Sequence, residues 1–186
     1  MPFGAHETME VHEILNGSIN MINHFSLYAN QCQDHNLRQM IHNHMQTAIQ
    51  GYDQLVAYTH DYNAANRSMQ PYSQPNIQPQ QIRYGLHQPQ SHVPQTQGQL
   101  NDQQIIAGML CLHKGSAKNH IAASLECADP NVREMLIHGA VNCANQAYEV
   151  FLFMNQQGYY QVPTMEDHTA KTYLHSYQPV QQNIHQ

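Results

Sequence analysis

The sequence predicts an all-α protein, a four-helix bundle made of two repeated helical hairpins joined by a long Gln/Pro-rich crossover. Three observations predict this fold: an internal repeat, apolar residues spaced three and four apart, and a proline-rich segment between the two halves. Spacings of three and four place side chains on one face of a helix. A single hairpin is too small to bury its apolar face, so the two copies are expected to share one core.

The internal repeat relates residues 32–58 to residues 127–154. Matching residues first lie 95 positions apart, and after one inserted residue they lie 96 positions apart. The matches at the first spacing include Leu15 with Leu110, Cys32 with Cys127, Asp34 with Asp129, Arg38 with Arg133 and Met40 with Met135. Those at the second include Ile41 with Ile137, His42 with His138, Ala48 with Ala144, Gln50 with Gln146 and Tyr52 with Tyr148. Two copies of one supersecondary unit are therefore expected.

Four helices are expected, at about residues 6–33, 36–62, 102–125 and 129–158. Asp34 and Asp129 precede the second and fourth helices, where an Asp side chain accepts a hydrogen bond from a backbone N–H that has no partner in the helix. Pro130 suits the first helical position. The turns are short, so each pair is expected to be antiparallel. The predicted buried face of the second hairpin includes Leu110, Ala117, Ile121, Leu125, Ala144 and Phe151.

The two hairpins are separated by a segment of different composition, which holds ten Gln and five Pro in residues 63–100. Such a segment cannot form a core, and it is far longer than an ordinary helix–helix loop. It is long enough to return along the bundle, so that the third helix runs parallel to the second, as in ferritin-like bundles. The expected units are residues 1–62 (first hairpin), 63–100 (crossover linker), 101–158 (second hairpin) and 159–186 (polar Tyr/Gln-rich tail).

The charge pattern limits the classes of partner that the chain is expected to bind. Charged residues make up 11% of the chain, against about 25% in an average protein. The net charge of −6 and only seven scattered Lys and Arg argue against nucleic acid or an anionic membrane as a partner. No apolar run approaches a membrane span, and residues 1–10 lack the pattern of an export signal. A weakly charged, amide-rich surface instead favours packing into a homo-oligomer or an extended array.

The residues of a ferritin-like dimetal site are not found. That site needs Glu-x-x-His on two helices, and none of the seven Glu residues has a His three positions later. Glu149 and its repeat partner Asp53 are the most site-like carboxylates, but they are flanked by amide and apolar residues, so solvated or hydrogen-bonded roles are expected. The sequence predicts no metal ligands among them.

Fifteen histidines leave one alternative open. His42 and His44 point about 200° apart on a helix, so they cannot chelate one ion alone. His44, His113 and His120 fall near apolar faces, where an interior cluster could bind Zn²⁺ or Cu²⁺. The alternative function is therefore a metal-binding ferritin-like protein with histidine ligands. The favoured interpretation is that the histidines hydrogen-bond to Asn and Gln.

No nucleophilic site is expected either. The four cysteines, Cys32, Cys111, Cys127 and Cys143, show no CxxC spacing and are expected to be buried, reduced thiols in a cytosol. Cys32 and Cys127 precede helix N-termini, but the neighbouring Asp opposes a lowered thiol pKa. The sequence holds no GxSxG, no HExxH and no Gly-rich phosphate loop. It therefore predicts no enzyme, no catalytic residue and no cofactor.

The second half of the chain resembles the coat-F family of bacterial spore coat proteins. The resemblance lies in Asp102-Gln103, in the turn from Ala128 to Arg133, in Tyr148-Glu149 and in Gly158-Tyr159-Tyr160. The first half is similar to a degenerate second copy. The resemblance implies a ferritin-like bundle without a metal centre. It also implies a structural role alongside other spore coat proteins, with synthesis in the mother-cell cytoplasm and final location in the coat or at the spore surface.

Overall fold

The computed structural model describes residues 3–63, 79–88, 94, 96 and 98–179. The long helices are α1 (Ala5–Gln31), α2 (His35–His60), α3 (Asp102–Leu125) and α4 (Pro130–Gln156). A 3-10 turn (η2, Pro79–Gln81) lies in the crossover, and a short helix, α5 (Asp167–Leu174), lies in the tail. The chain is all-α, as predicted. Much of the predicted crossover, including residues 64–78 and 89–93, lies outside the described residues.

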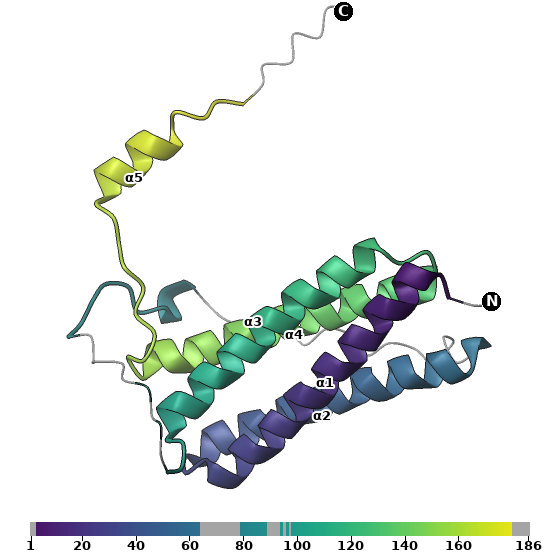
Figure 1. Ribbon diagram of the computed structural model, residues 1–186. Helices are drawn as coiled ribbons and strands as arrows, with labels where there is room; N and C mark the ends of the chain where they lie inside the picture. The colour runs from purple at the N-terminus through teal and green to yellow at the C-terminus, as the bar shows by residue number, and fades with distance from the viewer. Residues whose placement is uncertain (1–2, 64–78, 89–93, 95, 97, 180–186) are drawn as a thin grey trace, which may run out of the picture.

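The four long helices form two antiparallel hairpins that pack against each other (Figure 1). Helix α1 lies beside α2 and α3, and α4 lies beside α3 and α2, although α2 and α4 contact each other least. The turn after α1 reaches the first residue of α3, where the backbone N–H groups of Gln33 and Asp34 donate to the Asp102 carboxylate. Helices α2 and α3 therefore begin at the same end of the bundle and run parallel.

The two tight turns are capped as predicted. The Asp34 carboxylate accepts a hydrogen bond from the backbone N–H of Leu37 at 2.8 Å. The Asp129 carboxylate accepts from the N–H groups of Asn131 and Val132, and Pro130 opens α4. These side chains complete hydrogen bonds that a helix N-terminus leaves open, so each repeat begins its second helix by the same local device.

A second carboxylate supports each turn from the opposite hairpin. Asp102 accepts the N–H of Asp34 at 2.9 Å, and Glu7 accepts the N–H of Asp129 at 2.9 Å. Glu7 and Asp102 lie 95 positions apart, which is the spacing of the repeat. The two contacts are thus related by the approximate twofold symmetry of the hairpins, and they join the hairpins at opposite ends of the bundle.

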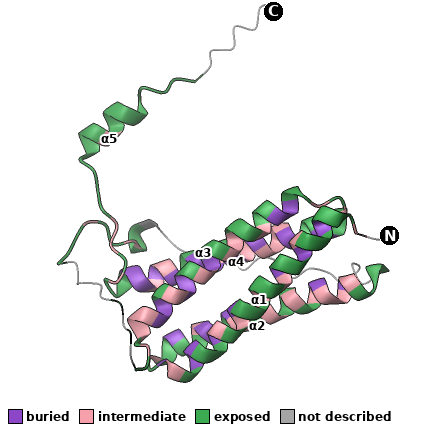
Figure 2. Cartoon of the chain, viewed as in Figure 1, coloured by how far each residue is buried: buried purple, intermediate pink, exposed green. Residues whose placement is uncertain are grey.

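The core consists of two apolar clusters. The larger contains Phe25, Leu37, Ile106 and Val150 among others, and the smaller contains Val11, Leu55 and Val132. Figure 2 shows the buried positions along the facing sides of the helices.

Three predicted core residues are exposed instead. Ile121 and Leu125 expose 46% and 74% of their surface, and Ala144 is also exposed. Residues four apart on a helix are rotated by about 40° relative to each other, so three such steps from His113 bring Leu125 about 120° away. At the end of α3 the buried residues are instead Ala123 and Ser124.

The described part of the crossover is held against the end of α4. The side chain of Asn155, which is 2% exposed, accepts a hydrogen bond from the N–H of Arg83 at 2.8 Å and donates to the carbonyl of Arg83 at 3.0 Å. Gln161 makes the same two-way contact with His87, at 2.7 Å in each direction. These amide side chains fix residues 83–87 beside the chain that leaves α4, and α5 then extends away from the bundle (Figure 1).

Candidate functional site: a histidine pair and an interhelical cavity

Three polar side chains from three helices meet inside the bundle. Nδ1 of His44 on α2 lies 3.0 Å from Nε2 of His113 on α3. Nε2 of His44 lies 3.1 Å from the carboxylate of Glu149 on α4. His44 and His113 are 2% and 0% exposed, whereas the Glu149 side chain is about half exposed. The histidine pair therefore connects the core to a carboxylate at the surface.

The hydrogen-bond chemistry fixes the proton positions in this chain of contacts. An ionised carboxylate can only accept, so His44 donates from Nε2 to Glu149. In the tautomer of His44 with its one proton on Nε2, Nδ1 accepts from the Nε2–H of His113. This leaves Nδ1 of His113 unprotonated, and this buried atom has no hydrogen-bond partner among the described residues. The aromatic ring of Phe25 packs beside His113, with ring centroids 5.3 Å apart.

Electrostatics agree with that assignment. Burial, with a smaller contribution from His44, lowers the pKa of His113 to about 3, so this imidazole is neutral at physiological pH. The hydrogen bond from His44 lowers the pKa of Glu149 below its usual value, against the smaller opposing effect of burial. The network thus has a neutral interior end and a negative surface end.

The other predicted histidines lie apart from this pair. His42 is exposed while His44 is buried, as expected for positions about 200° apart on a helix. His120, seven residues after His113, lies in a separate cavity. Within the ranges that the structure describes, no group of three or more His, Cys, Asp or Glu is placed to hold a metal ion.

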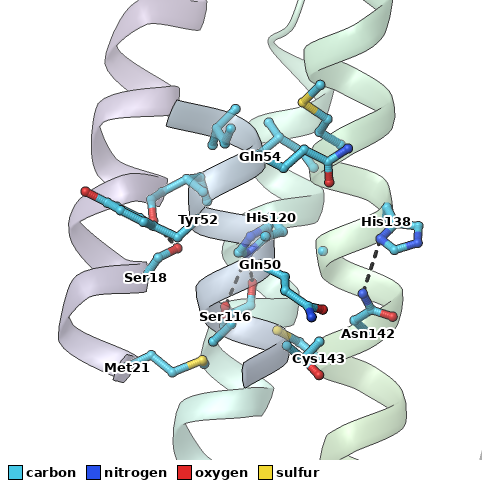
Figure 3. A pocket seen from close by; sticks show the side chains of 18 of the residues that line it. Ser18, Met21, Gln50, Tyr52, Gln54, Ser116, His120, His138, Asn142 and Cys143 are labelled. Carbon is cyan, nitrogen blue, oxygen red and sulfur yellow. Dashed lines mark hydrogen bonds between the residues drawn. The ribbon is translucent and has the colours of Figure 1, made fainter. Parts of the chain in front are cut away.

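The cavity lies between the two apolar clusters and has a volume of about 250 Å³. All four long helices contribute to its wall, and it extends between α2 and α4 (Figure 3). Ile14, Leu55 and Leu136 line it on the side of the smaller cluster, and Met21 and Cys143 line it on the side of the larger. The remaining wall is made of Ala48, Met135, two glycines and polar side chains.

The cavity and the histidine pair occupy related halves of the repeat. His113 corresponds to Ser18 at the 95-residue spacing, and His44 corresponds to Ala140 at the 96-residue spacing. Ser18 lines the cavity. One half of the bundle interior thus holds two imidazole rings, and the related half has a hydroxymethyl and a methyl group at the equivalent positions. Sequence analysis missed this contrast, although aligning the repeat through Ser18 and Ala140 would have indicated it.

The four cysteines differ in how far they are buried. All four are free thiols, but the expected burial holds only for Cys32 and Cys143, because Cys127 is half-buried and Cys111 is exposed. Burial is the main cause that raises the pKa of Cys32 and of Cys127 to about 11. The hydrogen bond to Asp102 raises the Cys32 value further, and the charges of Glu7 and Glu10 raise that of Cys127. These two thiols remain protonated and poorly nucleophilic at neutral pH.

Among the described residues, each helix is too short or too polar to cross a bilayer.

Comparison with known proteins finds a matching domain in the second half of the chain and a similar protein over most of its length. Residues 101–163 match the model of the Coat F domain. The chain is 28% identical over 187 residues to the spore coat protein F-like protein YhcQ of Bacillus subtilis (strain 168), covering 96% of this chain and 82% of that protein.

The fold also matches a solved structure. A candidate spore coat protein from Bacillus halodurans C-125 superposes with a TM-score of 0.66 at 14% identity, over 90% of this chain and 97% of the other. At that identity the match concerns the fold alone. Residues 101–163 thus match the Coat F domain, and nearly the whole chain is similar to a spore coat protein F-like protein.

Proposed function

We propose that this chain is a structural component of the bacterial endospore coat that self-assembles through contacts between helical bundles. The proposal includes synthesis in the mother-cell cytoplasm, followed by assembly into the coat or at the spore surface with other coat proteins. The Coat F domain at residues 101–163 and the similarity to a spore coat protein F-like protein support the assignment to the coat.

The observation that supports self-assembly best is the exposed tail after α4. Helix α5 has no buried residue and extends away from the bundle (Figure 2). Tyr173 and Tyr177 expose 70% and 72% of their surface, and Met165 and Leu174 are similarly exposed. Apolar and aromatic side chains gathered on a segment that leaves its own core are typical of contact sites for another protein surface.

The composition of the bundle favours contacts between copies. Only 11% of residues are charged, so electrostatic repulsion between neighbouring molecules is weak. A tail of one copy that binds the bundle of the next makes a head-to-tail contact, in which two different surfaces meet. Such contacts close into rings or continue as open arrays, depending on the rotation between neighbours. An extended coat layer requires the open form.

Sedimentation velocity of the purified full chain and of a tail variant tests the proposed contact. Replacing both Tyr173 and Leu174 by Ser removes apolar surface from α5 without touching the bundle. We expect the full chain to form concentration-dependent oligomers and the double variant to sediment mainly as monomer. Truncation to residues 1–162 is expected to act likewise, because Val162, whose carbonyl accepts from the N–H of Gly85, is retained.

The matched control replaces two polar residues of the same helix, His168 and Thr172, by Ser. This variant is expected to assemble as the full chain does. Equal assembly of the Tyr173/Leu174 variant and the control would show that the tail is not the contact. A full chain that remains monomeric at high concentration would overturn self-assembly itself.

A metal-binding protein with histidine ligands is the second candidate. One observation favours it: the unprotonated Nδ1 of His113 has a free lone pair in the core. Against it, both ring nitrogens of His44 and the second nitrogen of His113 are engaged in hydrogen bonds. Metal analysis after purification separates the two functions, because a metal site predicts about one Zn²⁺ or Cu²⁺ per chain that is lost in His113→Leu.

A further inference from the structure

The geometry points to a binding site in the interhelical cavity for a small, uncharged aromatic molecule that has one hydroxyl group, with phenol as the simplest example. The volume is sufficient, because an apolar cavity of about 150 Å³ is enough to bind benzene, and this one measures about 250 Å³. The inference stands on the cavity alone and does not depend on self-assembly.

The wall excludes a charged ligand. None of the described residues that line the cavity is Asp, Glu, Lys or Arg. A buried charge without a partner is strongly disfavoured, so a carboxylate or an ammonium group would remain in water. Phenol meets this requirement, because a phenolic hydroxyl with a pKa near 10 stays neutral at physiological pH.

The apolar part of the wall suits an aromatic ring. Met21, Met135 and Cys143 bring three sulfur atoms to the cavity, and Ile14, Leu55 and Leu136 add aliphatic surface. Thioether sulfur makes favourable contacts with aromatic rings, and methionine adapts its shape to fill irregular space. A flat ring between α2 and α4 would bury its faces against these side chains.

His120 supplies the hydrogen-bond acceptor for the hydroxyl group. Its Nδ1 lies 2.9 Å from the carbonyl oxygen of Ser116. A carbonyl can only accept, so the proton is on Nδ1 and Nε2 carries a lone pair. The contacts of His120 with the hydroxyl and the carbonyl of Ser116 are both made by Nδ1, which leaves Nε2 to face a ligand. Burial also lowers the pKa of His120, which keeps the ring neutral.

Glycine on α4 positions this ring at the cavity. A Cβ at Gly139 would lie 2.5 Å from Cδ2 and 2.8 Å from Nε2 of His120, so a larger residue would displace the imidazole. The repeat partner of His120 is Phe25, which packs against His113. In the related half, Ser18 takes the place of His113, and the space next to His120 is open (Figure 3).

The test titrates the full chain with phenol and with benzene, followed by isothermal calorimetry and by ¹H–¹⁵N spectra. We expect saturable one-to-one binding of phenol. Benzene should bind about 2- to 12-fold more weakly, the range for one lost hydrogen bond. His120→Phe keeps a ring of similar size and removes the lone pair. This variant should therefore bind phenol only as tightly as the unmodified chain binds benzene.

Occluding variants locate the site. Ser18→Leu fills the cavity from α1, and Gly51→Leu fills it from α2, where an added Cβ meets no other atom within 4 Å. Each should weaken phenol binding at least tenfold. Ser26→Leu, the same substitution at an exposed position of α1, is the matched control and should bind phenol as the unmodified chain does.

The two occluding variants change separate walls, so the test remains valid if one of them fails to fold. Circular dichroism checks the folding of each. The inference is overturned if the folded full chain shows no saturable phenol binding. It is also overturned if a folded Ser18→Leu or Gly51→Leu variant binds phenol with unchanged affinity, since the ligand would then lie elsewhere.

Discussion

The burial of His113 makes the stability of the fold depend on pH. Burial lowers its pKa from 6.5 to about 3, so the folded chain leaves this ring neutral where the unfolded chain protonates it. Its contribution to stability is therefore complete above about pH 6.5 and is lost as the pH falls from there toward about 3. Glu149, whose pKa is also lowered in the fold, contributes in the same direction on the acid side.

We predict that His113→Leu flattens the fall in stability on acidification, by up to about 1.4 kcal/mol per pH unit. The variant also leaves Nδ1 of His44 without a donor, so its stability near neutral pH is expected to be lower. Urea unfolding at about pH 7 and about pH 5 measures the difference. His42→Leu, at an exposed position, is the control, and equal slopes for both variants would contradict the role of burial.

The carboxylates that join the hairpins give a second prediction at this scale. Asp102→Ala removes the acceptor for two backbone N–H groups, those of Gln33 and Asp34. We expect a loss of about 1–3 kcal/mol in the free energy of unfolding, measured by urea denaturation. Asp167→Ala, on the exposed α5, should change it by less than about 0.5 kcal/mol. A similar loss in both variants would mean that the contact to the turn is not the cause.

Helix boundaries and caps could be predicted from sequence because they depend on neighbouring residues. Asp34 and Asp129 act on N–H groups two or three positions ahead. The contact of Glu7 with Asp129 joins residues 122 positions apart, and the network of His44, His113 and Glu149 needs three helices in register. Residue spacing along one helix does not tell how that helix is positioned along its neighbours. The candidate site could therefore be found only in the packed bundle.

The end of α3 shows where periodicity fails within a single helix. An apolar residue every four positions predicts burial of Ile121 and Leu125, but the helix rotates this row away from the core. We predict that Ile106→Ala costs about 2–5 kcal/mol, as is usual for a fully buried aliphatic residue. Leu125→Ala should cost less than about 0.5 kcal/mol. Thermal or urea unfolding of the two variants measures both losses. Equal losses would contradict the assignment of Ile106 to the buried face of α3 and of Leu125 to the exposed face.

At the scale of the whole molecule, the repeat explains both the fold and its asymmetry. Two hairpins with matched turns and matched carboxylate contacts close one bundle, with α2 and α3 parallel and a crossover between them. The halves then differ in their interior, where one contains the histidine pair and the other a cavity. The tail belongs to neither repeat, and it leaves the bundle with its aromatic side chains exposed.

Electron microscopy of the purified full chain tests the central claim, assembly into a coat material, most directly. At high protein concentration and low salt, we predict sheets or fibres built from repeating units about the size of one bundle. The variant with Ser at positions 173 and 174 should give dispersed particles under the same conditions. A field of single, separate bundles for the unmodified chain would contradict the account.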